Sequence, residues 1–262
     1  AIEARVLSWL ADEEWRMQVF ATHGKIYEAS AAMMYDLPIE SIAKDSIERH
    51  KGKVAELALG YQGAAGAMKQ MGAEGMGLDD AEIGNIVRVW RDKNPKIVEL
   101  WAAVDDAVKE AVQKSCEIKL TGYKNITIKS DGKVLTILLP SGRKLFYQKP
   151  RMTRNKWGQP SVKYMGQHNS HWVWVESYGG KFVENICQAI ARDILGVAML
   201  KIDAEGIPLV MHVHDEVVAE AKTEDAENVL KTMCEIMGEE ISWAPGLVLG
   251  ADGFTTPFYK KD

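Results

Sequence analysis

The sequence predicts an α+β fold in which a mostly helical half precedes a sheet that carries helices of its own. Up to residue 115, apolar side chains recur at the three- and four-residue spacing of helices. After Cys116 the period falls to two, as in strands, and a helical pattern returns over the last third of the chain. Such runs of one element type, without strict alternation, are typical of α+β proteins.

The helical half is divided by its apolar spacing and by its prolines and glycines. Leu37-Pro38 ends the second helix, Pro95 suits the first turn of the last one, and glycines separate the third and fourth. The expected helices are Glu3–Ala21, Ile26–Tyr35, Ser46–Tyr61, Asp79–Asp92 and Pro95–Ser115.

In the second half of the chain, strands and helices follow one another in turn. Turn dipeptides at Asp131-Gly132 and Ser141-Gly142 separate short strands of a meander. The expected elements are strands Asn125–Ser130, Val134–Leu139 and Lys144–Gln148, a long helix Tyr178–Ala204, strands Ile207–His214 and Val217–Ala221, and a helix Glu224–Met237.

Composition excludes several classes of protein. With 262 residues, 47% hydrophobic and 26% charged, the chain is neither disordered, nor collagen-like, nor a small disulfide-stapled domain. Its three cysteines lack Cys-x-x-Cys spacing, so we expect buried thiols in a reducing compartment. Apolar runs fall short of the ~20 residues of a membrane span, and no secretory leader opens the chain. We expect a cytoplasmic protein without a membrane partner.

Charge is distributed unevenly along the chain. The net charge is −5, but residues 132–175 hold eight Lys or Arg and no Asp or Glu, interleaved with six aromatic residues. We call residues 132–175 the basic segment. Cations and aromatic rings together suit contact with phosphates and bases. The alternative is a set of twisted strands with solvated basic faces.

An acidic pair lies between two apolar runs near the C-terminus. Asp215-Glu216 follows Val213-His214 at the expected hairpin turn, where carboxylates can hold a divalent cation. One alternative is a hairpin with two ordinary solvated acids. A second is a zinc hydrolase, because His212 and His214 share a strand face, although zinc usually needs a third protein ligand.

A stripe of four residues runs along the third expected helix. Steps of four residues advance 40° on a helix, so Arg49, Lys53, Leu57 and Tyr61 follow one side for three turns. Such a stripe could bind a nucleoside triphosphate lengthwise, with cations on the phosphates and the ring near the base. The alternative is an amphipathic helix with solvated cations and a buried Leu and Tyr.

The long helix after Tyr178-Gly179-Gly180 carries a polar strip. Lys181, Gln188 and Arg192 lie within about 40° of one another. Taken alone, the strip favours an ordinary exposed helix face.

Together, these motifs resemble those of family A DNA polymerases, the DNA polymerase I family, and most of all its phage-type members. Arg49-x3-Lys53-x3-Leu57-x3-Tyr61 is similar to the fingers-helix motif, and Val213-His214-Asp215-Glu216 to the palm hairpin motif. Gln188 resembles the glutamine segment between them, and Ile2-Glu3 the end of the first palm motif. The resemblance covers nearly the whole chain and implies a palm, with an antiparallel sheet and packed helices, plus a mostly helical fingers subdomain.

The resemblance also implies a division of the chain. Residues 1–22 would belong to the palm, 23–135 to the fingers, and 136–262 to the palm again, with the catalytic hairpin around 207–221. The implied activity is template-directed addition of deoxynucleotides to a primer 3′-hydroxyl by two-metal nucleotidyl transfer, with primer-template DNA and deoxynucleoside triphosphates as partners.

Roles follow residue by residue from the same resemblance. Asp215 would ligate Mg²⁺, Glu216 would support that site, and Lys53 would protonate the departing pyrophosphate. The nucleotide contacts would be Glu3, which closes the ribose pocket, and Arg49, Lys53, Leu57 and Tyr61. The DNA contacts would be Gln188, His214, Arg143 and Lys144.

The chain departs from the family pattern at several positions. Leu57 stands where relatives often have Phe or Tyr, Tyr27 where many cellular members have a triphosphate-contacting His, and Gln62 interrupts the usual Tyr-Gly pair. The Asp of the first palm motif would lie three positions before Ala1. We therefore expect an N-terminal polymerase portion to supply that second metal ligand and the thumb, and the 262-residue chain alone to be weak or inactive.

Two alternatives from other classes remain at this point. One is a nucleic-acid-binding protein without catalysis, favoured by the basic segment. The other is a metallohydrolase that uses His212, His214 and Asp215.

Overall fold

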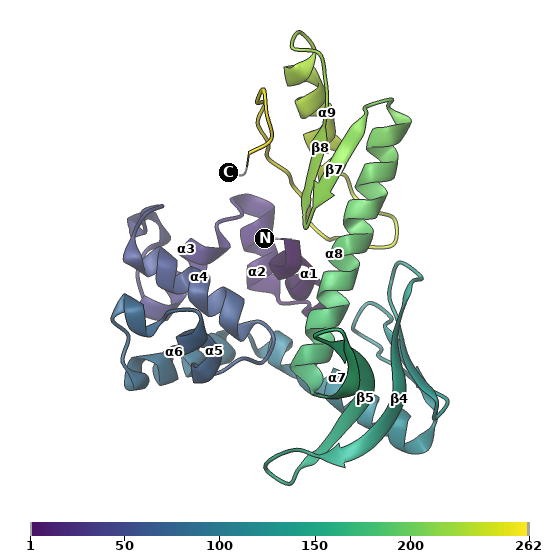
Figure 1. The fold of residues 1–262 in the computed structure, drawn as a ribbon. Helices are drawn as coiled ribbons and strands as arrows, with labels where there is room; N and C mark the ends of the chain where they lie inside the picture. The colour runs from purple at the N-terminus through teal and green to yellow at the C-terminus, as the bar shows by residue number, and fades with distance from the viewer. Residues whose placement is uncertain (1, 261–262) are drawn as a thin grey trace.

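A computed structural model describes residues 2–260 of the chain. The helices before Pro95 gather on one side of the long helix α8 (Gly179–Ala204), and the main sheet lies against the N-terminal end of that helix, where it packs on the helix that begins at Pro95 (Figure 1). The helical elements of the first half are α1 (Ile2–Ala11), α2 (Glu14–Thr22), α3 (Ile26–Tyr35), α4 (Ile47–Leu59), α5 (Ala65–Gln70), α6 (Asp80–Lys93) and α7 (Pro95–Lys114), with short 3-10 turns at Ile39–Ser41 and Glu74–Met76.

The expected first helix, Glu3–Ala21, is wrong as a single helix because the chain breaks between α1 and α2. Asp12 adopts a left-handed conformation, with φ of 53°, which no α-helix contains. The break frees Glu13, whose Oε2 accepts the backbone N–H groups of Lys96 at 2.9 Å and Ile97 at 3.3 Å. These donors belong to the first turn of α7 and have no partner within that helix. The apolar period continues through the break, so the pattern alone does not reveal it.

Helices α4, α6 and α7 begin within one residue of the predicted starts. The Ser46 hydroxyl accepts the backbone N–H of Arg49 at the start of α4. Asp79 and Glu82 form a reciprocal capping box at the start of α6. Pro95 stands in the first turn of α7. Each cap satisfies or removes N–H groups that a helix start leaves without partners.

The main sheet is antiparallel, and each strand pairs with the next in the chain. Its strands are β1 (Glu117–Lys119), β2 (Thr127–Ser130), β3 (Val134–Leu138), β4 (Lys144–Arg154), β5 (Pro160–His168) and β6 (His171–Ser177). The expected subdomain boundary at 135/136 falls inside β3, and the proposed division of the chain stays a prediction.

The sheet extends beyond the expected meander. The third strand was expected to end at Gln148, but β4 runs on to Arg154 because a bulge absorbs Pro150. Lys149 has φ of 50°, and the register shifts between Gln148 and Arg151. A proline that cannot donate to the ladder is tolerated at such a bulge.

The last third returns to the predicted order. Helix α8 (Gly179–Ala204) is followed by β7 (Leu209–Val213) and β8 (Glu216–Ala219), which pair antiparallel, and by α9 (Ala226–Gly238). Among residues 2–260, no helix combines the length and the apolar character needed to cross a membrane.

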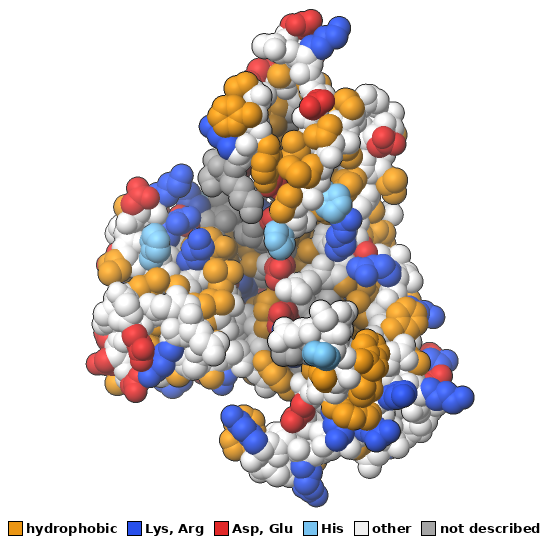
Figure 2. All heavy atoms as spheres, viewed as in Figure 1, with side chains coloured by type: hydrophobic (Ala, Val, Ile, Leu, Met, Phe, Trp, Pro, Cys, Tyr) orange, Lys and Arg blue, Asp and Glu red, His pale blue; other side chains and the backbone are white. Residues whose placement is uncertain are grey.

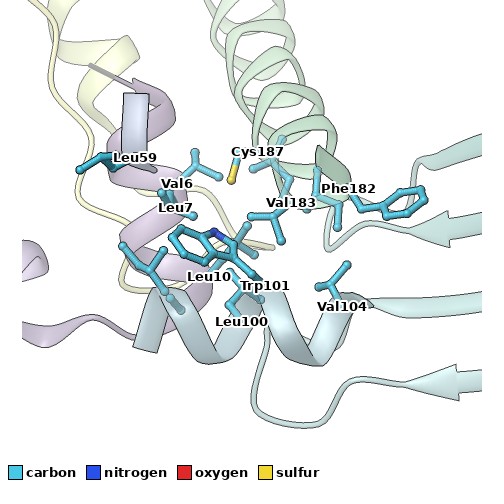
Figure 3. Close-up of a cluster of buried hydrophobic side chains, with 14 of the residues drawn as sticks. Val6, Leu7, Leu10, Leu59, Leu100, Trp101, Val104, Phe182, Val183 and Cys187 are labelled. Carbon is cyan, nitrogen blue, oxygen red and sulfur yellow. The ribbon is translucent and has the colours of Figure 1, made fainter. Parts of the chain in front are cut away.

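The core joins both halves of the chain. Side chains from α1, α4, α7 and α8 meet in one apolar cluster (Figure 3), which includes Val6, Leu7, Leu10, Leu59, Leu100, Trp101, Val104, Phe182, Val183 and Cys187. Of the three cysteines expected to be buried, only Cys187 is fully buried, whereas Cys116 and Cys234 are partly exposed. Because α4 and α8 share this core, both residue stripes predicted on them are mounted on one packed body.

Candidate active site

Helix α4 presents its predicted stripe outward. Its other face is buried against the protein, and at Gly52 the packing against α3 is so close that a Cβ would lie 2.3 Å from the Tyr27 carbonyl oxygen. Lys53 is exposed and Leu57 is 50% exposed. The alternative of a buried Leu and Tyr is therefore wrong for Leu57, whereas Tyr61 is partly buried and packs against the apolar core.

Arg49, at the N-terminal end of the stripe, contacts two side chains of α3. Its Nε donates to Glu28 Oε1 at 2.7 Å, and its guanidinium carbon lies 5.6 Å from the centre of the Tyr27 ring. The cation is thus held in place while about a fifth of its side chain stays exposed. Glu28 was not identified from the sequence, because a single acid on an apolar helix gives no distinctive spacing.

Tyr61, just after the C-terminal end of α4, lies beside the predicted Glu3. The Tyr61 hydroxyl donates to Glu3 Oε2 at 3.0 Å, which joins α4 to α1. Burial, followed by the nearby Cys187 and Glu3, raises the pKa of Tyr61 far above its usual value, so the phenol stays a neutral donor. Two residues that lie 58 positions apart, each given a nucleotide contact by the family resemblance, are thereby brought together.

The start of α8 fixes this end of α4. A Cβ on Gly180 would lie 2.4 Å from the Tyr61 carbonyl oxygen, and the Gly180 N–H donates to Gln62 Oε1 at 2.9 Å. The Trp101 indole also donates to the Gly60 carbonyl at 3.0 Å. Gly180 is needed here for close approach, and Gln62, a departure from the family pattern, has a structural role.

The acidic pair lies where the sequence predicted, at the end of the β7–β8 hairpin. Val213 pairs with Glu216, which leaves His214 and Asp215 as a two-residue turn. His214 has φ of 52°, as tight hairpin turns of this length require, and both turn residues are exposed. Tyr259, which the sequence did not point to, donates to Glu216 Oε2 at 3.4 Å.

Electrostatics place the hairpin turn near the α3–α4 pair. Burial is the main cause of the raised pKa of Tyr27, and the charges of Glu56 and Asp215 raise it further, whereas Arg49 opposes them. Asp215 and Arg49 therefore act on the same phenol from two different elements. Figure 2 shows a hollow between the lobe of α3 and α4 and the hairpin, with cationic side chains on the lobe side.

Helix α8 flanks the hairpin with its polar strip. Gln188 is exposed between the buried Cys187 and Ala189. Arg192 Nη2 lies 3.4 Å from His212 Nε2, so a cation stands beside one of the two histidines of the zinc hypothesis. Among residues 2–260, no three His, Cys, Asp or Glu side chains are grouped as a metal site would require.

Arg143 and Lys144 lie apart from this hollow, at the start of β4. Arg143 Nε pairs with Asp193 Oδ1 at 2.5 Å and its Nη2 donates to the Ala189 carbonyl at 2.6 Å. The arginine thus anchors the turn before β4 to α8, a contact that local spacing does not reveal. Lys144 is exposed.

No family model matches the chain, whereas a curated protein and solved structures are similar to it over nearly its whole length. The chain is 50% identical to the DNA polymerase of Bacillus phage SP02 over 264 residues, which takes in all of this chain and 40% of that polymerase. Its structure is similar to the POL domain of Pol1 from M. smegmatis, solved in complex with DNA primer-template and dNTP. The TM-score is 0.60 and the identity 16%, over 96% of this chain and 37% of the other. The predicted α+β fold, with antiparallel sheet and helical part, is confirmed as that of a polymerase domain.

Proposed function

We propose that this chain forms the palm and fingers of a template-directed DNA polymerase, which adds deoxynucleotides to a primer 3′-hydroxyl. One observation carries the proposal: the exposed cationic stripe of α4 and the Asp215 turn border the same hollow, next to Tyr27. The 50% identity to a phage DNA polymerase supports it. Because the chain spans 40% of that polymerase, the remaining portion is expected to complete the enzyme.

The stripe suits an incoming deoxynucleoside triphosphate. Arg49 and Lys53 would bind its phosphates through charge-assisted hydrogen bonds, and Lys53 would give a proton to the departing pyrophosphate. Arg49 is already paired with Glu28, so the phosphates would share a cation whose position is fixed beforehand. Leu57, half exposed, would lie against the sugar.

The Tyr61–Glu3 pair suits the other end of the nucleotide. The Tyr61 ring would lie by the nascent base pair, and its hydroxyl orients the Glu3 carboxylate through the 3.0 Å hydrogen bond. A carboxylate held in one place can exclude a ribose 2′-hydroxyl by occupying its space. Discrimination against ribonucleotides would then depend on both residues.

The turn acids fit a magnesium site in part. Asp215 and Glu216 offer hard carboxylate oxygens, and Mg²⁺ is commonly bound by one or two carboxylates together with substrate phosphates. Asp215 would be the direct ligand and Glu216 would support it. A second aspartate, and with it a second ion, is expected from the part of the polymerase that this chain does not span. Bound Mg²⁺ would polarise the α-phosphate and favour attack by the primer 3′-hydroxyl.

The exposed polar groups beside the turn suit the DNA. Gln188 on α8 and His214 in the turn would contact primer or template near the growing end. Arg143 and Lys144 would contact the DNA farther away, with Arg143 held by Asp193. These groups position the substrates, which is the main contribution of protein to phosphoryl transfer.

A chimera tests this function. Residues 1–262 would replace the matching region of the phage SP02 polymerase, and extension of a primed template would be measured with Mg²⁺. We expect synthesis, and a fall of about 10²–10³-fold in turnover for Asp215→Asn, the size of effect that loss of one charge-stabilising group has in other enzymes. Lys231→Ala, a substitution of an exposed cation on α9, should leave turnover unchanged.

A DNA-binding protein without catalysis is the second candidate, favoured by the exposed aromatic and basic surface of β4–β6. It predicts a folded chimera that binds primed DNA without extending it. Equal turnover for the chimera with and without Asp215→Asn would rule out the catalytic assignment of the turn.

A further inference from the structure

One face of the main sheet carries large aromatic side chains that the core does not use. Phe146 on β4 and Trp172 and Trp174 on β6 are 62%, 59% and 40% exposed. Gln148 pairs with Met165, and Met165 pairs with Trp174. Because residues two apart in a strand share a face, all three aromatic rings lie on the same side of the sheet. We call these three rings the aromatic face.

The opposite side of the same strands is the one that packs on the protein. Tyr147 and Tyr164 meet edge to face, and Tyr147 contacts Phe182 of α8 at 5.2 Å between ring centres. The aromatic face therefore adds nothing to that core. A group of exposed rings on one surface is unusual in a soluble protein and indicates a binding site.

Two cations lie over one of these rings, that of Trp174. The Arg151 guanidinium lies 4.5 Å and the Lys163 ammonium 5.3 Å from the centre of the Trp174 ring. Both belong to the basic segment, which holds no acid, and Glu176, paired opposite Lys163, stands just beyond its end. Figure 2 shows hydrophobic side chains bordered by Lys and Arg over β4 and β5, on the same side of the molecule as the hollow.

We infer that the aromatic face binds single-stranded DNA, with bases stacked on Phe146 and Trp172 and phosphates on Arg151 and Lys163. The site deepens the proposed polymerase function, since a polymerase handles an unpaired template strand. A single strand fits better than a duplex because stacking on a ring needs a base plane that a duplex keeps covered. Sheets with exposed aromatic rings bind single strands in this way.

The position of the sheet suits such a strand. Asn185 of α8 donates to the Tyr147 hydroxyl at 3.1 Å, so the sheet is fastened to the N-terminal part of α8. Gln188 and Arg192 follow on the same helix, and Arg192 reaches the β7–β8 hairpin. One rigid helix therefore connects the aromatic face with the candidate active site.

Binding of a fluorescent 20-nucleotide oligo-dT to the 262-residue chain, followed by anisotropy, tests the inference. Phe146→Ala and Trp172→Ala should each weaken binding about 5- to 150-fold, which corresponds to ~1–3 kcal/mol per stacked base. Trp172→Phe keeps a ring and should restore most of the affinity. Leu200→Ala, which removes an apolar side chain that is 73% exposed on α8, should change nothing.

Salt dependence tests the cations separately. Each phosphate contact on a single strand contributes about 0.7 to the slope of log affinity against log salt concentration. Arg151→Ala with Lys163→Ala should reduce that slope by about 1.4, whereas Lys114→Ala with Lys231→Ala, which removes two exposed cations elsewhere, should leave the slope unchanged.

Unchanged oligo-dT affinity in both Phe146→Ala and Trp172→Ala would overturn the inference, as would an equal loss for a blunt duplex. Urea unfolding of each variant checks that the sheet is intact, and Phe146, the most exposed of the three rings, provides a second substitution if Trp172→Ala fails to fold. Synthesis by the chimera depends on Asp215 and not on these rings for its chemistry. A chimera that extends primers while the ring variants bind normally would thus refute this site and leave the proposed function standing.

Discussion

The two faces of α4 differ in the environment of their charged side chains: the charge on one face is buried and hydrogen-bonded, and the other face carries charges that solvent can reach. On the buried face, the Glu56 carboxylate accepts hydrogen bonds from Arg16, from Ser30 at 2.6 Å and from the Trp90 indole at 2.9 Å. On the outer face, Lys53 is exposed and Arg49 is only partly covered. Charges that the protein itself satisfies hold a helix in place, whereas charges left at the surface of a hollow are available to a ligand.

Arg16, on α2, completes the buried network by joining two further parts of the chain. It also donates to Ser8 on α1 at 2.8 Å and to Asn94, the residue before α7, at 3.1 Å. The network thereby fixes α4 against α1, α2, α3 and α6. The exposed Lys53 and Leu57 are thereby carried on a helix whose position is fixed from its buried side.

The largest expected effect comes from disrupting the buried ion pair between Arg16 and Glu56. Glu56→Gln leaves the Arg16 guanidinium buried without a counter-charge and should lower the free energy of unfolding by about 3–5 kcal/mol. Urea unfolding measures this. Glu99→Gln, which breaks the exposed pair with Lys96, should cost less than about 1 kcal/mol. Equal losses of unfolding free energy in Glu56→Gln and Glu99→Gln would show that the buried and the exposed ion pair contribute equally to stability.

Acidification should remove the stability that the charged Glu56 carboxylate provides. Burial alone would raise the pKa of Glu56, but the Arg16 charge and the hydrogen bonds from Arg16, Ser30 and Trp90 outweigh it and place the pKa below its usual value. Stability from this group is therefore complete above the unfolded pKa, about 4.3, and is lost as the pH falls through the folded pKa. The difference in unfolding free energy between the unsubstituted chain and Glu56→Gln should shrink on acidification. If that difference in unfolding free energy grows as the pH falls, the predicted direction of the Glu56 pKa shift is wrong.

Substitution on the outer face should affect turnover instead of stability. Lys53→Ala in the chimera should lower turnover about 10²–10³-fold, while the free energy of unfolding changes by less than about 0.5 kcal/mol. Lys51 lies on the same helix but off the stripe, 5.7 Å from the Tyr35 ring centre, so Lys51→Ala is a matched control. Similar turnover in both variants would remove Lys53 from the mechanism.

The smallest expected effect comes from Tyr61, just after the C-terminal end of α4. Tyr61→Phe removes one hydrogen bond to Glu3 and should cost about 1 kcal/mol of stability. With Glu3 less well oriented, the chimera should incorporate ribonucleotides about fivefold more readily relative to deoxynucleotides, which corresponds to the same ~1 kcal/mol. Tyr178→Phe, at an exposed tyrosine, is the control. If the ratio of ribonucleotide to deoxynucleotide incorporation is unchanged in Tyr61→Phe, the hydrogen bond that orients Glu3 has no role in sugar selection.

Local signals in the sequence predicted the elements that have them. Ser46, Asp79 and Pro95 begin α4, α6 and α7 because their side chains satisfy or replace backbone donors. Strands β5 and β6 were not placed, because Trp172 and Trp174 point outward and remove the usual alternation of apolar and polar residues.

The candidate site was predicted to a different extent at each residue. Spacing alone placed Arg49, Lys53 and Leu57 on one stripe, and the structure leaves that stripe outside the core. The family resemblance gave Glu3 and Tyr61 separate nucleotide contacts but did not predict the hydrogen bond between them, and the Arg16–Glu56 pair was not expected at all. Contacts between residues 40 or 58 positions apart depend on packing, which periodicity does not record.

The central claim is that the Asp215 turn and the α3–α4 pair border one hollow. A cutting reagent, such as an iron chelate tethered to His214→Cys, would cleave the backbone near the turn, with the unsubstituted chain treated identically as background. We predict cleavage within residues 25–30 and 47–53 in addition to the hairpin itself. Cleavage confined to the hairpin and α8 would place the turn away from the cationic stripe and contradict the proposed site.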